Sequence, residues 1–129
     1  MSLHSTPIRV RFSDLDPYHH VNHSVYLSYF EVGRSSLLDS KNITLFELQQ
    51  AGFQMVVSEI SVKYLAPATA GLSISVESEI VKRRKVSTIW SQRLVGNGVL
   101  LATASVTIVT TNLEGKVARL PKPLAEILL

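Results

Sequence analysis

The sequence has 129 residues, the usual size of one domain, so we expect a single domain over residues 1–129. Apolar residues make up 46% and charged residues 18%, a composition that favours a folded core over disorder. The sequence contains no cysteine, which excludes disulfide scaffolds, thiolate–metal sites and thiol nucleophiles. It has neither an apolar run long enough to span a bilayer nor the pattern of a signal peptide, so we expect a soluble, cytoplasmic protein.

The formal net charge of +3 is unevenly distributed. Residues 1–60 carry four Lys/Arg against six Asp/Glu, whereas residues 61–129 carry nine against four. Much of this excess is one run, Lys82-Arg83-Arg84-Lys85. A basic half can attract nucleic acid, an acidic carrier protein or a phosphorylated small molecule. Helix-turn-helix spacing, zinc-finger ligands and an aromatic RNA-binding signature are all absent from the sequence, which disfavours nucleic acid.

The first elements are a strand and a long helix separated by a turn. Residues 7–12 alternate apolar and basic side chains, which predicts a strand. Residues 13–22 are rich in turn formers and end in Asn22, a predicted helix N-cap. A helix is then expected from His23 to about Ser40, with its apolar stripe formed by Tyr26, Phe30 and Leu37. Gly33 falls on that stripe, which indicates that another element passes close by.

The rest of the chain is predicted to be mostly strand. Thr44 to Glu47 is a capping-box pattern for a short second helix that Gly52 can end. Four long strands follow, at 53–65, 71–82, 85–96 and 99–111, separated by turn signals that include Gly96-Asn97-Gly98. Residues 121–129 are interpreted as a tail or a short helical turn. The predicted fold class is therefore α+β, with one long helix wrapped by a curled antiparallel sheet of about five strands.

The segment from Ser13 to Asn22 is unusually rich in groups that carry chemistry. It holds two carboxylates (Asp14 and Asp16), two imidazoles, a phenol and an amide directly before the positive end of a helix. A carboxylate beside free helix N–H groups has the parts needed for acyl transfer. The carboxylate would attack or activate water, and an N–H would stabilise the developing oxyanion.

The run from Phe12 to Tyr26 resembles the signature of hotdog-fold thioesterases of the 4-hydroxybenzoyl-CoA thioesterase type. That signature has an aspartate, any residue and a second aspartate, then Gly-His-Val-Asn-Asn and a tyrosine shortly after. The similarity continues through Tyr29-Phe30-Glu31 and Arg34, and reappears in Val62-Lys63-Tyr64-Leu65-Ala66-Pro67. The order of strand, helix and meander matches the family across nearly the whole chain.

The resemblance implies hydrolysis of an acyl thioester, without metal or cofactor, to a free acid and a thiol. Asp16 matches the family's catalytic carboxylate, which acts as nucleophile or general base, and the backbone N–H of about His23 matches the donor to the thioester carbonyl. The substrate would be an acyl-CoA, or alternatively an acyl-carrier protein. The family's fold also implies a homodimer joined edge to edge through its sheets, with the acyl pocket at the subunit interface, and many relatives form tetramers.

Two residues depart from the family pattern. His19 stands where the family has glycine, and His23 stands where it has the second asparagine. If that glycine requires a positive φ, a histidine there is strained or shifts the loop. We expect His19 to affect the range of substrates.

Other residues have two interpretations each. His20, Asn22 and Tyr26 either organise the loop or contact substrate, Asp14 is expected to hold the loop, and Glu59 either faces the helix in a polar role or points outward. His19, His20, His23 and Asp16 could suggest a metal site, but a second ligand cluster is missing from the sequence and we expect no metal. Lys82, Arg83, Arg84 and Lys85 are either a solvated hairpin end or a contact for coenzyme A phosphates or a carrier protein.

Two alternative functions remain on the same fold. A hotdog hydratase or dehydratase would use an aspartate and a histidine as acid and base, a pair that Asp16 and His20 could imitate. A non-catalytic acyl-thioester sensor would bind without turnover, and the carboxylate at position 16 disfavours this interpretation because binding alone does not need it.

Overall fold

The computed structural model describes residues 3–128. Its elements follow the predicted order, with one strand, a long helix, a short helix, four strands and a terminal helix. Their bounds are β1 (His4–Ile8), the 3₁₀ helix η1 (Phe12–Asp14), α1 (Val25–Ser40), α2 (Leu45–Gln50), β2 (Phe53–Tyr64), β3 (Ile74–Arg83), β4 (Ser87–Gly96), β5 (Val99–Asn112) and α3 (Lys122–Ile127).

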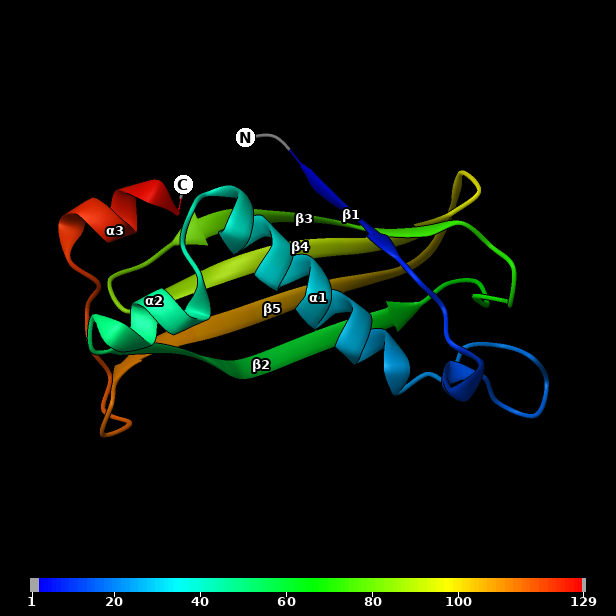
Figure 1. Ribbon diagram of the computed structural model, residues 1–129, viewed down its shortest axis with the longest axis horizontal. Coiled ribbons are helices and arrows are strands. Elements are labelled where there is room, and N and C mark those ends of the chain that lie inside the picture. Colours follow the sequence, from blue (N-terminus) through cyan, green and yellow to red (C-terminus); the bar gives the residue numbers. More distant parts are fainter. Residues whose placement is uncertain (1–2, 129) are drawn as a thin grey trace.

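The five strands form one antiparallel sheet in the order β1-β3-β4-β5-β2 (Figure 1). The strands β3, β4 and β5 are an uninterrupted meander, whereas β1 and β2 come from earlier in the chain and form the two edges. Asn97 and Gly98 both have positive φ, at +50° and +79°, as a tight turn between twisted strands requires. The predicted meander is confirmed, with strand ends within three residues of those expected.

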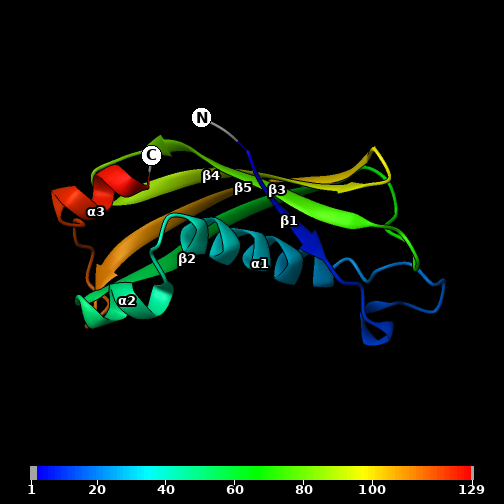
Figure 2. The same cartoon turned by 45° about the horizontal axis from the view of Figure 1, so that its top comes forward.

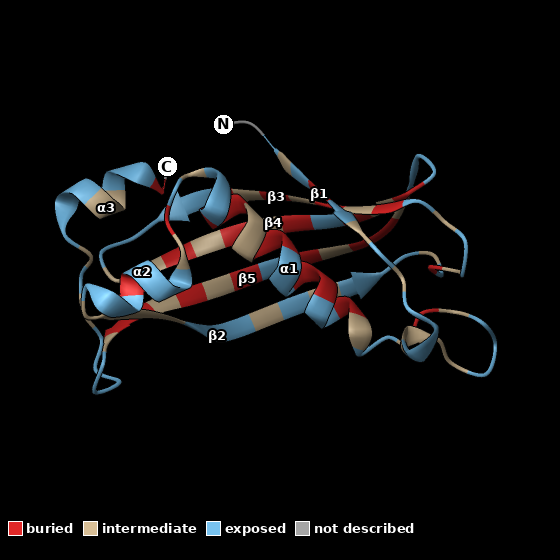
Figure 3. Cartoon of the chain, viewed as in Figure 1, coloured by how far each residue is buried: buried red, intermediate tan, exposed pale blue. Residues whose placement is uncertain are grey.

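The sheet curls around α1, which lies along its concave face (Figure 2). Buried residues alternate with less buried ones along β3, β4 and β5, and α1 also carries a run of buried residues (Figure 3). Phe30, Val76 and Trp90 are fully buried at this contact. The predicted α+β architecture is therefore confirmed.

At Gly33, α1 packs directly against β3. A Cβ at this position would lie 2.5 Å from Cγ1 of Val76 and 2.9 Å from Oγ of Ser78, both on β3. Only the missing side chain permits this approach, as the glycine on the apolar stripe predicted.

The first strand is the main error of the sequence interpretation. It was expected at residues 7–12, but β1 spans His4–Ile8. Its partner β3 begins at Ile74, opposite Ile8, so the ladder has nothing to pair with beyond that residue. Phe12 instead starts η1, whose turn is fixed by the Arg11 N–H donating to Oδ2 of Asp14 at 2.9 Å.

The two short helices match their sequence signals. In α2, the Thr44 hydroxyl accepts from the Glu47 N–H at 3.0 Å, and Gly52 ends the segment with φ +96°. The expected helical turn near the C-terminus is α3. Within residues 3–128, none of the helices has the length and apolar character to cross a membrane.

Candidate active site

The segment between η1 and α1 folds back on itself into a closed turn. The Asp16 N–H donates to the carbonyl of His20 at 2.7 Å, and the His19 N–H donates to the carbonyl of Asp16 at 3.0 Å. Val21 is buried and its N–H donates to the carbonyl of Ala68 at 2.7 Å, which fastens the turn to the chain that follows β2. The loop is thus held by its own backbone and by one distant segment.

The carboxylate of Asp16 has one oxygen in use and one free. Its Oδ1 accepts backbone N–H bonds from Tyr18 at 2.8 Å and His20 at 3.1 Å. Among residues 3–128, no donor lies within hydrogen-bond distance of Oδ2. The side chain is therefore oriented through one oxygen while the other remains available to a substrate or water molecule.

His19 adopts a left-handed backbone conformation, with φ +61°. This is the position at which the resembling family has glycine, so the condition for strain stated above is met. Its side chain is exposed. The turn is closed in spite of this strain because the neighbouring backbone bonds hold it.

Asp14 has the structural role that the sequence suggested. Its Oδ2 accepts from the Tyr29 hydroxyl at 2.8 Å as well as from the Arg11 N–H, so it ties η1 to α1. Burial and the bond to Asp14 raise the pKa of Tyr29 well above its ordinary value, which keeps the phenol protonated as a donor.

The start of the helix differs from the prediction. The helix α1 begins at Val25 rather than His23, and its N-cap is Ser24 rather than Asn22. Asn22 acts one step earlier, because its Oδ1 accepts from both the N–H (3.1 Å) and the hydroxyl (3.0 Å) of Ser24. These bonds close a turn that precedes the helix, so the N-cap is Ser24, two residues after the expected one.

The residues after β2 complete this end of the molecule. The Tyr64 hydroxyl donates to the carbonyl of His23 at 2.8 Å, and the Tyr26 hydroxyl accepts from the Ala68 N–H at 3.0 Å. The two tyrosine rings meet edge to face with centroids 5.0 Å apart. Tyr26, which is 3% exposed, thus organises the loop. Sequence reasoning gave Tyr64 no role of its own, since its contact depends on a residue 41 positions away.

The backbone N–H of His23 has no acceptor within residues 3–128. Its carbonyl is occupied by Tyr64, and Ser24 already has helical dihedrals, with φ −69° and ψ −26°. The N–H therefore precedes the positive end of α1 and is available to an anionic or carbonyl oxygen.

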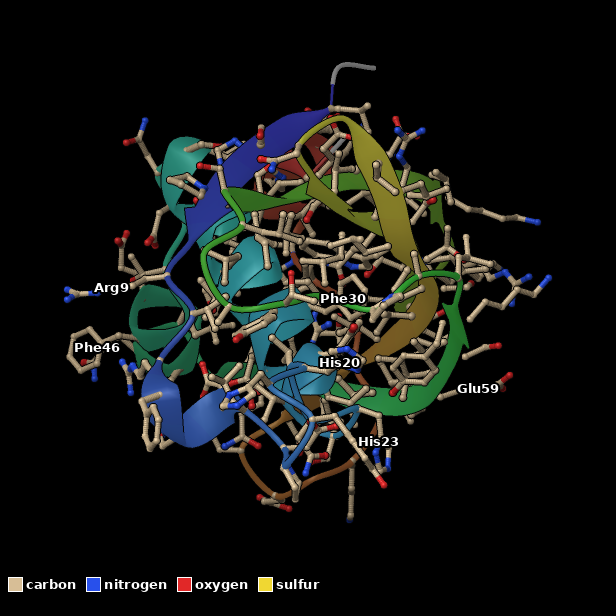
Figure 4. All side chains as sticks on the ribbon, turned by 90° about the vertical axis from the view of Figure 1, so that its right-hand side faces the viewer. Arg9, His20, His23, Phe30, Phe46 and Glu59 are labelled. Carbon is tan, nitrogen blue, oxygen red and sulfur yellow. The ribbon has the colours of Figure 1, made fainter. Side chains whose placement is uncertain are left out.

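Two sets of candidate residues lie apart from this loop. Glu59 is exposed on β2 and points away from the ribbon, whereas His20 and His23 lie at the end that carries the loop (Figure 4). Of the two interpretations of Glu59, the structure therefore has the one in which its side chain points outward. The run Lys82 to Lys85 is exposed at the β3–β4 turn, at the opposite end of the sheet from the loop (Figure 1). The ten residues of β3 separate the two ends by about 30 Å.

Asp16 lines none of three hollows formed by residues 3–128. One of about 840 Å³ lies between the β1–η1 segment and α1, with Asp14 and Tyr29 in its wall. Asp16 is absent from its lining, and from that of two smaller cavities formed by residues 3–128. In that part of the chain, no three His, Asp or Glu side chains are grouped closely enough to hold a metal ion.

Chemically, this end of the molecule combines an oriented carboxylate with a free oxygen and an open backbone N–H. These are the groups that activate a nucleophile and stabilise the oxyanion formed at an attacked carbonyl. Asp16 and His20 are linked through the His20 N–H, but their side chains do not hydrogen-bond to each other within the described chain. An acid–base pair of these two side chains thus has no support in the structure.

Comparison with known proteins agrees with this chemistry. Residues 10–128 match the model of the thioesterase-like superfamily. The acyl-CoA thioester hydrolase YbgC of Escherichia coli O6:H1 is 30% identical over 118 residues, which cover 90% of this chain and 88% of that protein. The acyl-acyl carrier protein thioesterase ATL2 of Arabidopsis thaliana is 32% identical over 77 residues, which cover 60% of this chain and 41% of that protein.

A solved structure shows the same fold at similar identity. The crystal structure of a thioesterase from Thermus thermophilus, complexed with coenzyme A and Zn, superposes with a TM-score of 0.84 at 31% identity. The match covers 96% of this chain and 90% of that one. Because the family model spans nearly the whole chain, this protein belongs to the thioesterase-like superfamily and is a thioesterase with the hotdog fold.

Proposed function

We propose that this enzyme hydrolyses an acyl-CoA thioester to a free acid and coenzyme A, with Asp16 as the catalytic residue. The free Oδ2 either attacks the thioester carbon directly or takes a proton from an attacking water. In both routes the C–S bond breaks, the thiol leaves with a proton and the oxygen of water ends in the acid. The observation that carries the proposal is the carboxylate fixed through Oδ1 alone.

The oxyanion donor in this proposal is the backbone N–H of His23. It lies in the turn before α1 rather than within the helix, which is a change from the sequence expectation. The support for it is local, since the Tyr64 hydroxyl anchors the carbonyl of the same residue and the His23 N–H has no acceptor among the described residues. A fixed donor aimed at a developing negative charge needs no reorganisation during the reaction.

Coenzyme A is proposed as the thiol on the strength of two relatives. The Escherichia coli relative is named for acyl-CoA thioesters, and the Thermus thermophilus structure contains coenzyme A. The Arabidopsis relative is named for acyl-carrier protein and leaves a carrier-bound substrate as the second candidate.

We further propose that the enzyme acts as a homodimer joined through β2. This strand is twelve residues long, pairs with β5 on one side, and exposes Val56 and Val57 near its middle. The other edge, β1, has five residues and includes Pro7, which protects an edge from pairing. A two-fold axis would place two β2 strands antiparallel, and the exposed end that carries Asp16 would then meet a second copy.

The proposed dimer would also bring the basic run of one subunit close to Asp16 of the other. Arg83, Arg84 and Lys85 share a hollow of about 340 Å³ with Arg119 and Lys122. In one chain this hollow is too far from Asp16 to contact the same substrate. Antiparallel pairing would turn the partner end for end, so its basic hollow would lie at the same end as Asp16. We propose that it contacts the phosphates of coenzyme A or an acidic carrier protein there.

The test is thiol release from a panel of acyl-CoAs, from short aliphatic to long-chain and aromatic, by the wild type and Asp16→Asn. Asparagine keeps an oxygen for the two N–H bonds but loses the basic oxygen, so the rate should fall by about 10²–10⁴. Asp39→Asn, an exposed carboxylate near the end of α1, is the matched control and should keep the wild-type rate.

Each other result has a definite meaning. Turnover that survives Asp16→Asn would remove Asp16 from the chemistry. Acyl-CoA binding without turnover in the wild type would favour the sensor, and turnover of acyl-carrier protein alone would replace coenzyme A as the thiol.

A further inference from the structure

The positive charge of the chain is concentrated in two segments, residues 82–87 and 112–128. Together they carry seven Lys/Arg and two Asp/Glu, whereas all other residues carry six and eight. The first segment covers the β3–β4 turn, and the second follows β5 and includes α3. Both lie at the end of the molecule opposite the Asp16 loop (Figures 1 and 2). The two segments therefore form a basic end on a chain that is otherwise slightly acidic.

Backbone hydrogen bonds hold the two segments side by side. The N–H of Thr110, near the end of β5, donates to the carbonyl of Val86 at 2.8 Å, and the carbonyl of Thr110 accepts from the Ala118 N–H at 3.0 Å. The cations of the basic end are all exposed, at Lys82, Arg83, Arg84, Lys85, Lys116, Arg119 and Lys122. Within residues 3–128, no carboxylate oxygen lies within 4.0 Å of their side-chain nitrogens. Their charge is therefore directed toward solvent.

The turn after β5 presents two apolar side chains beside these cations. Leu113 is 54% exposed and Val117 61% exposed, and they lie on the two sides of a turn that projects beyond the strands (Figure 1). Oδ1 of Asn112 accepts from the N–H groups of Glu114 at 2.9 Å and Lys116 at 3.0 Å, and the Asn112 N–H donates to the carbonyl of Lys116 at 2.8 Å. These bonds order the turn, so its apolar pair is held in solvent by the fold.

We propose that the basic end docks on the surface of an anionic lipid bilayer, with Leu113 and Val117 entering the headgroup layer and Lys116 contacting anionic headgroups. A projecting apolar pair surrounded by cations fits such a surface, which is negatively charged outside and apolar beneath. An acidic protein would match the cations, but it would need an apolar pocket shaped to cover the projecting pair. None of these three side chains lines the hollow proposed above for coenzyme A, so the two interactions use different residues.

The test is sedimentation of the enzyme with vesicles of phosphatidylcholine alone and of equal parts phosphatidylcholine and phosphatidylglycerol, in about 0.1 M salt. Binding to the anionic vesicles should be at least about tenfold tighter, because one Lys or Arg near such a surface contributes about fivefold. Raising the salt to about 1 M should remove most of this preference, since exposed charges are then screened.

The double variant Leu113→Ser/Val117→Ser should weaken binding to the anionic vesicles by at least about tenfold, because the turn then has no apolar side chains to insert. The matched control is Leu65→Ser/Val99→Ser, which removes a leucine 55% exposed and a valine 51% exposed at the other end of the molecule. This control should bind as the wild type does. Lys116→Glu alters charge alone and should weaken binding by at least about fivefold.

Equal binding to the two kinds of vesicle would overturn the proposal. Binding to anionic vesicles that Leu113→Ser/Val117→Ser leaves unchanged, or that the matched control weakens equally, would also overturn it. Binding to polyglutamate without binding to anionic vesicles would assign the basic end to an acidic protein instead. All of these measurements are made without substrate, so they do not depend on the chemistry proposed for Asp16.

Discussion

At the scale of single residues, the loop around Asp16 combines a carboxylate oriented through one oxygen with a strained neighbour. Asp16 is oriented by two backbone N–H groups, and His19, three residues later, holds φ +61°. A left-handed conformation costs a residue with a Cβ roughly 1–2 kcal/mol, part of which glycine would lose again through its greater freedom in the unfolded chain. The strain is stored next to the proposed catalytic group.

His19→Gly should therefore stabilise the protein by about 0.5–1 kcal/mol, raising the melting temperature by a few degrees. Asn42, which has φ +59° beyond the end of α1, is the matched control. Asn42→Gly should gain less, because asparagine tolerates this conformation better than histidine does. We also expect His19→Gly, but not Asn42→Gly, to change the relative rates across the acyl-CoA panel. A lower melting temperature for His19→Gly would contradict the strain argument.

The Tyr29–Asp14 bond should make stability fall at alkaline pH. The pKa of Tyr29 is raised in the folded state by burial and by Asp14, so its contribution is complete below its ordinary value of about 10 and is lost as the pH rises above it. The loss approaches about 1.4 kcal/mol per pH unit for one proton. Urea unfolding between pH 8 and 11 should show a shallower decline for Tyr29→Phe than for the wild type. Tyr18→Phe alters an exposed phenol and should follow the wild type.

Residue roles were predictable where they depend on local sequence and not where they depend on contacts across the fold. The bonds that Asp16 accepts, and the cap that Thr44 provides, each join residues no more than four positions apart. The bond from Tyr64 to His23 joins residues 41 positions apart, and Arg34 meets Gln92 across 58 positions. No spacing rule relates such pairs, so their partners emerge only from the folded chain.

At the scale of elements, the position of α1 on the sheet depends on Gly33. The helix approaches β3 until a single methyl group would collide with Val76 and Ser78. The same approach allows Gln92 on β4 to reach the carbonyl of Phe30. One missing side chain thus sets both the packing distance and the polar network beneath the helix.

Gly33→Ala should destabilise the protein although alanine favours helix by about 1 kcal/mol. Overpacking of a tight core contact costs typically 1–3 kcal/mol, and two neighbours on β3 would have to move. Ser28→Ala, at an exposed position on the same helix, should change stability by less than about 0.5 kcal/mol. Chemical denaturation of the two variants checks this, and a stabilised Gly33→Ala would show that the close approach is not rigid.

The limits of a helix or strand were predictable where turn-forming or capping residues mark its ends. The strands of the meander end at Asn-Gly and basic turns, and α2 begins at a capping box, so their expected limits were close. The β1 strand lacks such signals, and its limits are set by the length of β3 beside it. An alternating pattern at residues 7–12 continues past the point where pairing stops.

At the scale of the whole molecule, the two sheet edges are unlike. The β1 edge is short and contains proline, whereas β2 is long and exposes valines. Edges of the second kind pair readily with another chain. The fold class and the β3-β4-β5 meander were predictable from the sequence pattern and the family resemblance. The placement of β1 and β2 at the two edges, and the choice of the edge that pairs, need the folded structure.

Val57→Lys should convert the proposed dimer into a monomer, since a charge at the middle of the paired edge would be buried against its own copy. Val81 on β3 is 43% exposed, the same as Val57, and provides a matched control. Light scattering after size exclusion should give half the mass for Val57→Lys and an unchanged mass for Val81→Lys. A wild type that already elutes as a monomer would contradict the proposed assembly.

The sheet order also dictates when this enzyme can become active during its synthesis. Chains emerge from the ribosome N-terminus first, and α1 and both edge strands precede the meander. The β2 strand, which ends at Tyr64, pairs with β5, which extends to Asn112, and β1 pairs with β3. Tyr64, the last residue of β2, and Ala68, shortly after it, both hydrogen-bond to the segment that follows Asp16. These contacts therefore depend on the pairing of β2 with β5. Translation must therefore pass Asn112 before the end of the molecule that carries Asp16 takes shape.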